Sequence, residues 1–200
     1  MRVAKLVMGG GTRFHGAVVV AADEVRREGH DQVRARLVRI LQDAHAGELA
    51  AAYAYRGHWK SLGRRPDEAA EVRRIEGAEW HHRALVARLL AELSARPRRR
   101  RELLMGAIGR LFGALCFVGG WFAPMYAAGR LEAMNVGQYE DARRAAVTLG
   151  LPAAATSLAA MRVEEDRHER WFGDRCRDHW LLPAAVLVWR WRPPEATVAP

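Results

Sequence analysis

The chain has 200 residues, 50% of them hydrophobic, which is enough to bury one core and excludes a string of several domains. Its two cysteines, Cys116 and Cys176, exclude a disulfide framework and a cysteine-rich zinc site, and we expect both to be buried, reduced thiols. The net charge of +9 indicates an anionic partner surface.

The first half of the chain is predicted to form a helical hairpin. Residues 1–30 lack a signal-peptide pattern and are expected to be a poorly structured extension, with at most a short helix near 18–27. The first long helix is expected over residues 31–60. The second, over residues 66–96, opens on a proline, which suits the first position of a helix. Residues 98–112 would then cross over to the second half.

The second half is predicted to repeat the hairpin. One helix is expected over residues 113–148, kinked at Pro124, and another over residues 153–179. A C-terminal apolar segment follows, and residues 193–200 are expected to be disordered. Strand patterns are nearly absent while Ala, Leu, Arg and Glu dominate, so the chain is predicted to be all-α.

Six side chains with metal-binding chemistry occur in an ordered repeat. In each half a lone glutamate precedes a Glu-x-x-His motif: Glu48, then Glu79 and His82; Glu132, then Glu165 and His168. Residues three apart share one helix face, so each motif can present a carboxylate and an imidazole to the same metal. This is the ligand set of a four-helix bundle that holds two metal ions. The lone glutamates would be terminal ligands, and the motif glutamates could bridge.

Each of the six lies in an apolar stripe of helical period, where a carboxylate is costly unless it is paired or metal-bound. The other members of the stripes are Leu41, Ala44, Ala52 and Tyr55; Val72, Ile75, Val86 and Leu89; Met125, Ala128, Val136 and Tyr139; Leu158, Met161 and Phe172. Four carboxylates with two imidazoles favour iron or manganese over structural zinc, and we predict two iron ions, Fe²⁺ or Fe³⁺. Glu76, Glu164 and Glu169 lie off the stripes and are expected at the surface or beside the ligands.

Two apolar stretches follow the basic run of residues 98–101. Residues 111–128 carry no charge, and their length is at the lower limit for a membrane span. Glycines and a proline interrupt them, which favours a membrane-contacting bundle helix. Residues 180–191 have Trp and Arg flanks typical of a lipid interface. Either a final helix packed on the bundle or membrane insertion would fit them. The side chains expected to face the substrate or the membrane are Trp121, Phe122, Trp189 and Trp191. No aromatic stacking platform accompanies the arginines, which favours a lipid bilayer surface and no nucleic acid.

Four motifs resemble those of one known family. They are His45-Ala46-Gly47-Glu48 with Tyr55 and Gly57; Glu79-x-x-His82 followed by Ala95-Arg96-Pro97; a glycine-rich apolar stretch leading to Glu132 and Tyr139; and Glu164-Glu165-x-x-His168. Together, over about residues 33–192, they resemble the demethoxyubiquinone hydroxylases, ferritin-like di-iron proteins of ubiquinone biosynthesis. The chain departs from that family at His58, where a Gln is usual, and at Gly137 and Gln138, where a His usually precedes the tyrosine.

The resemblance implies a ferritin-like four-helix bundle over residues 31–192, with a long crossover between helices two and three and a C-terminal apolar helix. It implies a di-iron monooxygenase that uses O₂ to hydroxylate the ring of a demethoxyubiquinol-like membrane quinol. The electron donor is unknown. We expect a peripheral protein on the cytoplasmic face of the cell membrane, and a homo-oligomer is possible.

Alternatives stay open for the role of two tyrosines and for the function of the chain. Tyr55 and Tyr139 are candidates for hydrogen bonds to the ligands or to the quinol, or for simple core packing. The other functions are a di-iron oxidase or peroxidase that acts on another substrate, and a non-catalytic, metal-containing, membrane-associated bundle.

Overall fold

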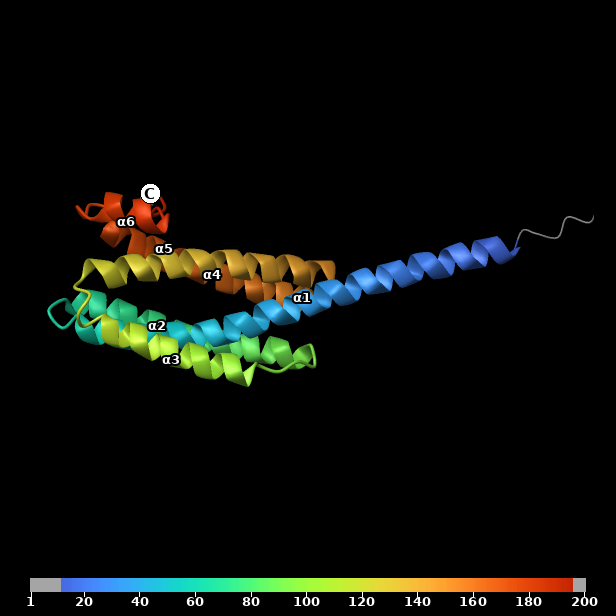
Figure 1. Ribbon diagram of the computed structural model, residues 1–200, viewed down its shortest axis with the longest axis horizontal. Coiled ribbons are helices and arrows are strands. Elements are labelled where there is room, and N and C mark those ends of the chain that lie inside the picture. The colour runs from blue at the N-terminus through green and yellow to red at the C-terminus, as the bar shows by residue number, and fades with distance from the viewer. Residues whose placement is uncertain (1–11, 196–200) are drawn as a thin grey trace, which may run out of the picture.

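Four long helices lie side by side in the computed structural model, which describes residues 12–195 and the side chains from Gly29 onward (Figure 1). These are α1 (Thr12–Ser61), α2 (Pro66–Glu92), α4 (Phe122–Thr148) and α5 (Pro152–Cys176). Two shorter helices, α3 (Arg99–Leu115) and α6 (Leu182–Trp189), pack against them. Residues 12–195 contain no strand, so the predicted all-α, ferritin-like bundle is confirmed.

The two hairpin turns form where the sequence predicts them. Pro66 and Pro152 each open a helix, where the missing backbone N–H breaks no intrahelical bond. Gly150 has a φ of +67°, a conformation that costs glycine little, and it ends α4 before Pro152. The α1–α2 and α4–α5 hairpins therefore face each other as the repeat predicted.

The crossover between the hairpins is itself a helix, α3, which lies along α1 (Figure 1). Gly109 makes this close packing possible: a Cβ there would lie 2.4 Å from the Ala50 carbonyl oxygen. At Gly113 a Cβ would lie 2.7 Å from the Tyr53 carbonyl oxygen, and Gly57 faces it on α1. Small residues let two helix backbones approach, so Gly113, one of the glycines that interrupt the apolar stretch 111–128, is part of a packing surface.

The third bundle helix starts later than expected. We predicted a helix over residues 113–148 kinked at Pro124, but the chain breaks after Leu115 and α4 begins at Phe122. Gly120, with a φ of +68°, lies in this break. Pro124 therefore falls in the first turn of α4, where an N–H has no intrahelical acceptor, and it causes no kink.

Both ends of the chain differ from expectation. Helix α1 begins at Thr12, so the extension expected to be poorly structured is helical from there on; residues 1–11 lie outside the described part. At the other end, Pro193 and Pro194 pack against Gly173 of α5, so the start of the tail is ordered, contrary to the prediction. Residues 196–200 are outside the described part, and the division of the chain into domains stays a prediction.

The buried core has two apolar parts. One contains Leu37, Leu41, Leu90 and Leu158, and the other contains Ile75, Met125, Phe172 and Cys176. The six predicted ligands belong to neither part, although they are on the same helix stripes. The fold thus places a belt of polar groups across the middle of a hydrophobic bundle.

Candidate metal centre

The six predicted ligands meet in this belt as two groups. Glu48, Glu79, His82 and Glu165 form one, and Glu79, Glu132, Glu165 and His168 form the other, with the ligand atoms of each group within 4.8 Å of one another. Glu79 and Glu165 belong to both groups, as expected for bridging carboxylates, and Glu48 and Glu132 each belong to one. All six side chains are buried.

The helix stripes deliver these side chains as their spacing predicted. Every predicted stripe residue on α1, α2 and α5 is buried, and on α4 Val136 alone is half-buried. The 3-4 spacing turns Glu79 and His82 toward the same side of α2, and Glu165 and His168 toward the same side of α5. His82 Nδ1 lies 2.8 Å from Glu165 Oε1, so the two hairpins are in direct contact at the belt.

Each terminal glutamate accepts a hydrogen bond from a tyrosine of the opposite hairpin. Tyr139 donates its OH to Glu48, and Tyr55 donates its OH to Glu132. Both tyrosines are buried, so of the two roles left open the structure supports hydrogen bonding to the ligands. Asn135 adds a bond from its Nδ2 to Glu132 Oε2 at 3.4 Å. Asn135 is not among the residues predicted from the sequence, although it lies three residues from Glu132 on the same helix.

The belt has the electrostatics of a cation site. Burial raises the pKa of Glu79 and Glu132 well above the usual value, and repulsion from Glu165 adds to this; the pKa of Glu48 is raised as well. Burial by itself would lower the pKa of His82. The neighbouring Glu165 and Glu48 outweigh this effect and raise the pKa to about 9. Burial also raises the pKa of Glu165, yet hydrogen bonds with Glu132, His168 and His82 bring it below its usual value.

The residues fit a pair of cations. Buried ligand atoms without a hydrogen-bond partner include Glu48 Oε2, both oxygens of Glu79 and His168 Nε2. Such atoms are expensive in a protein core unless a ligand satisfies them. Their carboxylate-rich chemistry suits iron or manganese, whereas structural zinc prefers cysteine and histidine.

Two of the side chains expected to face the membrane or substrate are buried. Phe122 is packed in the core, and Trp191 fills the space above Gly129 and donates its Nε1 to Glu169 Oε1 at 3.0 Å. Both are shielded from a bilayer, which corrects the membrane-facing part of the prediction; a place facing the substrate stays a prediction. Trp121 is half-buried and donates its Nε1 to Glu68, and Trp189 is exposed as expected.

Other polar groups near the motifs also have defined partners. Glu164 reaches His82 Nε2 at 3.1 Å, as a group beside a ligand would. Glu76 is not at the surface: it is buried and accepts bonds from Arg56 and Trp59. Cys176 is buried as predicted and Cys116 half-buried, and both are free thiols.

Apolar side chains outside the core gather in two places. On and just after α3 they are Leu103, Leu104, Leu111, Phe112, Leu115, Phe117 and Val118; around α6 they are Trp180, Leu187, Val188 and Trp189. Within the described part of the chain, no helix combines the length and hydropathy needed to cross a membrane.

Comparison with known families agrees with the site. The sequence model of the family described as "Ubiquinone biosynthesis protein COQ7" matches residues 35–169, a stretch that contains all six predicted ligands. Comparisons with curated proteins and with solved structures find no match. The chain belongs to the COQ7 family of ubiquinone biosynthesis proteins, which confirms the resemblance inferred from the motifs.

Proposed function

We propose that this member of the COQ7 family is a di-iron monooxygenase that hydroxylates the ring of a demethoxyubiquinol-like membrane quinol with O₂. The observation that carries the proposal is the belt itself: two ligand groups share Glu79 and Glu165, all of them buried. A site of this composition holds two iron ions in four-helix bundles with the same ligand pattern.

In this assignment Glu79 and Glu165, which belong to both ligand groups, would help to hold both irons. Glu48 and His82 would hold one of them, and Glu132 and His168 would hold the other. A pair of irons there would supply the activation of O₂. In the overall reaction a ring C–H becomes C–OH, and the second oxygen atom leaves as water. The two electrons come from a reductant and the two protons from solvent.

The chain's own residues orient and insulate that chemistry. Tyr55 and Tyr139 hold Glu132 and Glu48 by hydrogen bonds, which fixes the orientation of these carboxylates. The coordination positions that no side chain fills would stay open. Burial, followed by the neighbouring glutamates, raises the pKa of both tyrosines well above the usual value, so both stay protonated and keep donating. The apolar core on either side of the belt excludes water from the reacting groups.

A quinol with a long apolar tail requires access from a bilayer, and two features support a peripheral membrane location. The exposed leucines and Phe112 of α3 can enter the interface, and so can Trp180, Leu187, Val188 and Trp189 around α6. The arginine run 98–101 precedes the apolar side of α3, and the net charge is +9. Basic residues beside an apolar helix face are attracted to the anionic cytoplasmic leaflet.

The test is metal content and turnover on one purified sample. Iron per chain is measured first; then reductant, ¹⁸O₂ and a short-chain demethoxyquinol are supplied. We expect about two irons per chain and a product that gains one labelled oxygen atom. Glu79→Gln should lose iron and product. Glu92→Gln, at an exposed position on the same helix, should keep both.

The possible failures are distinct. Two irons without product would move the assignment to an oxidase or peroxidase with another substrate. A well-folded helical protein that takes up no iron or manganese would overturn the metal centre and, with it, the hydroxylase.

A further inference from the structure

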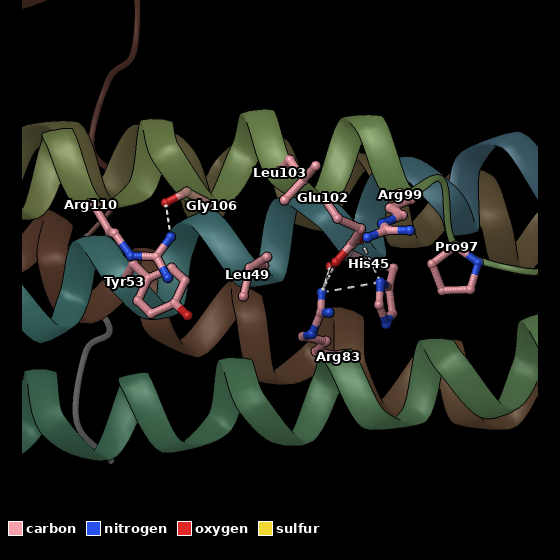
Figure 2. A pocket seen from close by; sticks show the side chains of 10 residues that line it. All are labelled: His45, Leu49, Tyr53, Arg83, Pro97, Arg99, Glu102, Leu103, Gly106 and Arg110. Atoms are coloured by element: carbon pink, nitrogen blue, oxygen red, sulfur yellow. Dashed lines mark hydrogen bonds and ion pairs between the residues drawn. The ribbon is translucent and has the colours of Figure 1, made fainter.

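A cavity of about 550 Å³ lies outside the metal belt, between α1, α2 and α3 (Figure 2). Helix α1 contributes Leu49 and Tyr53 to it, α2 contributes Arg83, and α3 contributes Leu103 among others. None of the six predicted ligands lines it. The proposed hydroxylation gives this cavity no role.

The cavity carries excess positive charge. Three arginines line it, Arg83, Arg99 and Arg110, against a single carboxylate, Glu102. The carboxylate of Glu102 is already paired, because its oxygens lie 2.6 Å from Arg83 Nη1 and 2.7 Å from His45 Nδ1. Burial lowers the pKa of His45 despite Glu102, so this histidine adds no charge near neutral pH.

Two of the arginines have no carboxylate partner among residues 29–195. Arg99 stands in the first turn of α3, where the helix dipole and free N–H groups also favour an anion. Arg110 lies over the Tyr53 ring, 3.9 Å from its centroid, and donates one bond to the Gly106 carbonyl oxygen. Figure 2 shows Arg99 and Arg110 toward opposite ends, with Leu49 and Leu103 between them.

The middle of the cavity is lined by Leu49 and Leu103, and α3 carries further exposed apolar side chains outside it. Leu103 lines the cavity and is 68% exposed, and its neighbour Leu104, which does not line it, is 60% exposed. Further along α3, Leu111, Phe112 and Leu115 are exposed as well. A ligand for this place needs an anionic group at one end and an apolar body, which is the chemistry of an anionic phospholipid.

We propose that this cavity binds an anionic phospholipid, with the phosphate at Arg99 and an acyl chain against Leu49 and Leu103. The inference rests on the proposed function, since a hydroxylase of a membrane quinol works at a bilayer. It adds a specific lipid site to a general attraction by surface charge. Such a site would anchor the bundle beside α3 and fix its orientation on the membrane.

The experiment measures binding of the full-length, iron-loaded protein to phosphatidylcholine vesicles with and without phosphatidylglycerol. The readout is the gain in affinity when phosphatidylglycerol is added. Arg99→Gln is compared with Arg100→Gln, the adjacent exposed arginine outside the cavity. Diffuse attraction to the surface should fall by about fivefold for either variant. Loss of a direct phosphate contact should lower the gain by about tenfold or more for Arg99→Gln alone.

A second pair keeps the test independent of the arginines. Leu103→Glu and Leu104→Glu add the same charge at adjacent exposed positions, but only the first places it in the cavity. The gain should be lost in Leu103→Glu and largely kept in Leu104→Glu. Equal effects within both pairs would overturn the site and leave only diffuse charge attraction.

Two further arms separate the other outcomes. If inorganic phosphate alone raises the melting temperature in an Arg99-dependent way while phosphatidylglycerol gives no gain, the site takes soluble phosphate and the lipid proposal fails. Turnover of a short-chain quinol in neutral detergent needs no anionic lipid. Normal turnover without the lipid gain would therefore refute the lipid site alone, and a lipid gain without iron or turnover would refute the hydroxylase alone.

Discussion

The Nε2 atom of His82 lies 3.1 Å from Glu164 Oε2, whereas Nε2 of His168 has no hydrogen-bond partner among the described residues. The two halves of the bundle are otherwise closely matched around the belt, with a tyrosine on each terminal glutamate. The difference has a simple origin: Glu164 precedes Glu165 on α5, but Ala78 precedes Glu79 on α2. The two ligand groups are therefore not equivalent.

A carboxylate behind a metal-ligating histidine fixes the ring and raises its basicity, so we expect the position at His82 to bind its cation more tightly. Glu164→Ala should weaken the tighter of the two binding steps by about 10–100-fold. The measurement is a stepwise anaerobic titration with Fe²⁺ or Mn²⁺ against a competing chelator. Ala78→Glu, which supplies the missing counterpart, should strengthen the weaker step.

Exposed Glu92→Ala serves as the control and should change neither step. Unchanged binding in Glu164→Ala would show that the contact with His82 does not act on the metal.

Removal of the metal should make stability depend on pH in a defined direction. Burial raises the pKa of Glu48, Glu79 and Glu132 above the usual value of a glutamate, so the folded, metal-free protein holds protons that the unfolded chain has released. Stability is then lost as the pH rises through the raised values, and the metal-free protein should melt at a higher temperature near pH 5 than near pH 8. The iron-loaded protein should not show this loss, because the cations replace the protons. Parallel melting curves of the two forms across this range would contradict the expectation.

His58 should produce the opposite slope at lower pH. It is buried beside Phe172, and burial lowers its pKa from 6.5 to about 4. Between these values the unfolded chain binds the proton and the folded protein does not, so stability falls as the pH falls through this window, by up to about 3 kcal/mol. His58→Gln should flatten that part of the profile, measured as the free energy of unfolding in urea on the iron-loaded protein. His81→Gln, at an exposed histidine, should leave it unchanged.

The contact between α1 and α3 should tolerate no added methyl group. A Cβ at Gly109 would lie 2.4 Å from the Ala50 carbonyl oxygen, so Gly109→Ala must push the two backbones apart. We expect a loss of about 1–3 kcal/mol or more in the free energy of unfolding. Gly137→Ala is the matched change, since a Cβ there meets nothing within 4 Å, and it should stabilise α4 by about 0.5–1 kcal/mol. Similar effects of the two substitutions would mean that α3 is not held by this contact.

The ligands could be predicted because helical period alone decides which side chains share a face. Glu79 and His82 needed no tertiary information, and their counterparts on α5 repeated the pattern. The sequence predicted residues 98–112 only as a crossover and gave Gly113 as a break in the apolar stretch; only the nearby backbone of α1 shows why small residues are needed there. Trp191 was misplaced for a related reason: the space that accepts its ring is created by Gly129, on a helix far away in the sequence.

The sharing of Glu79 and Glu165 between both ligand groups has a mechanical consequence. Each cation would draw ligands from both hairpins, so loading the centre would cross-link segments separated by most of the bundle sequence. A metal that stayed bound while the bundle opened would close a long loop in the opened chain and so remove chain entropy from that state. The iron pair would thus hold the two hairpins together. The metal-free protein could open between its two hairpins, whereas the iron-loaded protein would have to release metal first.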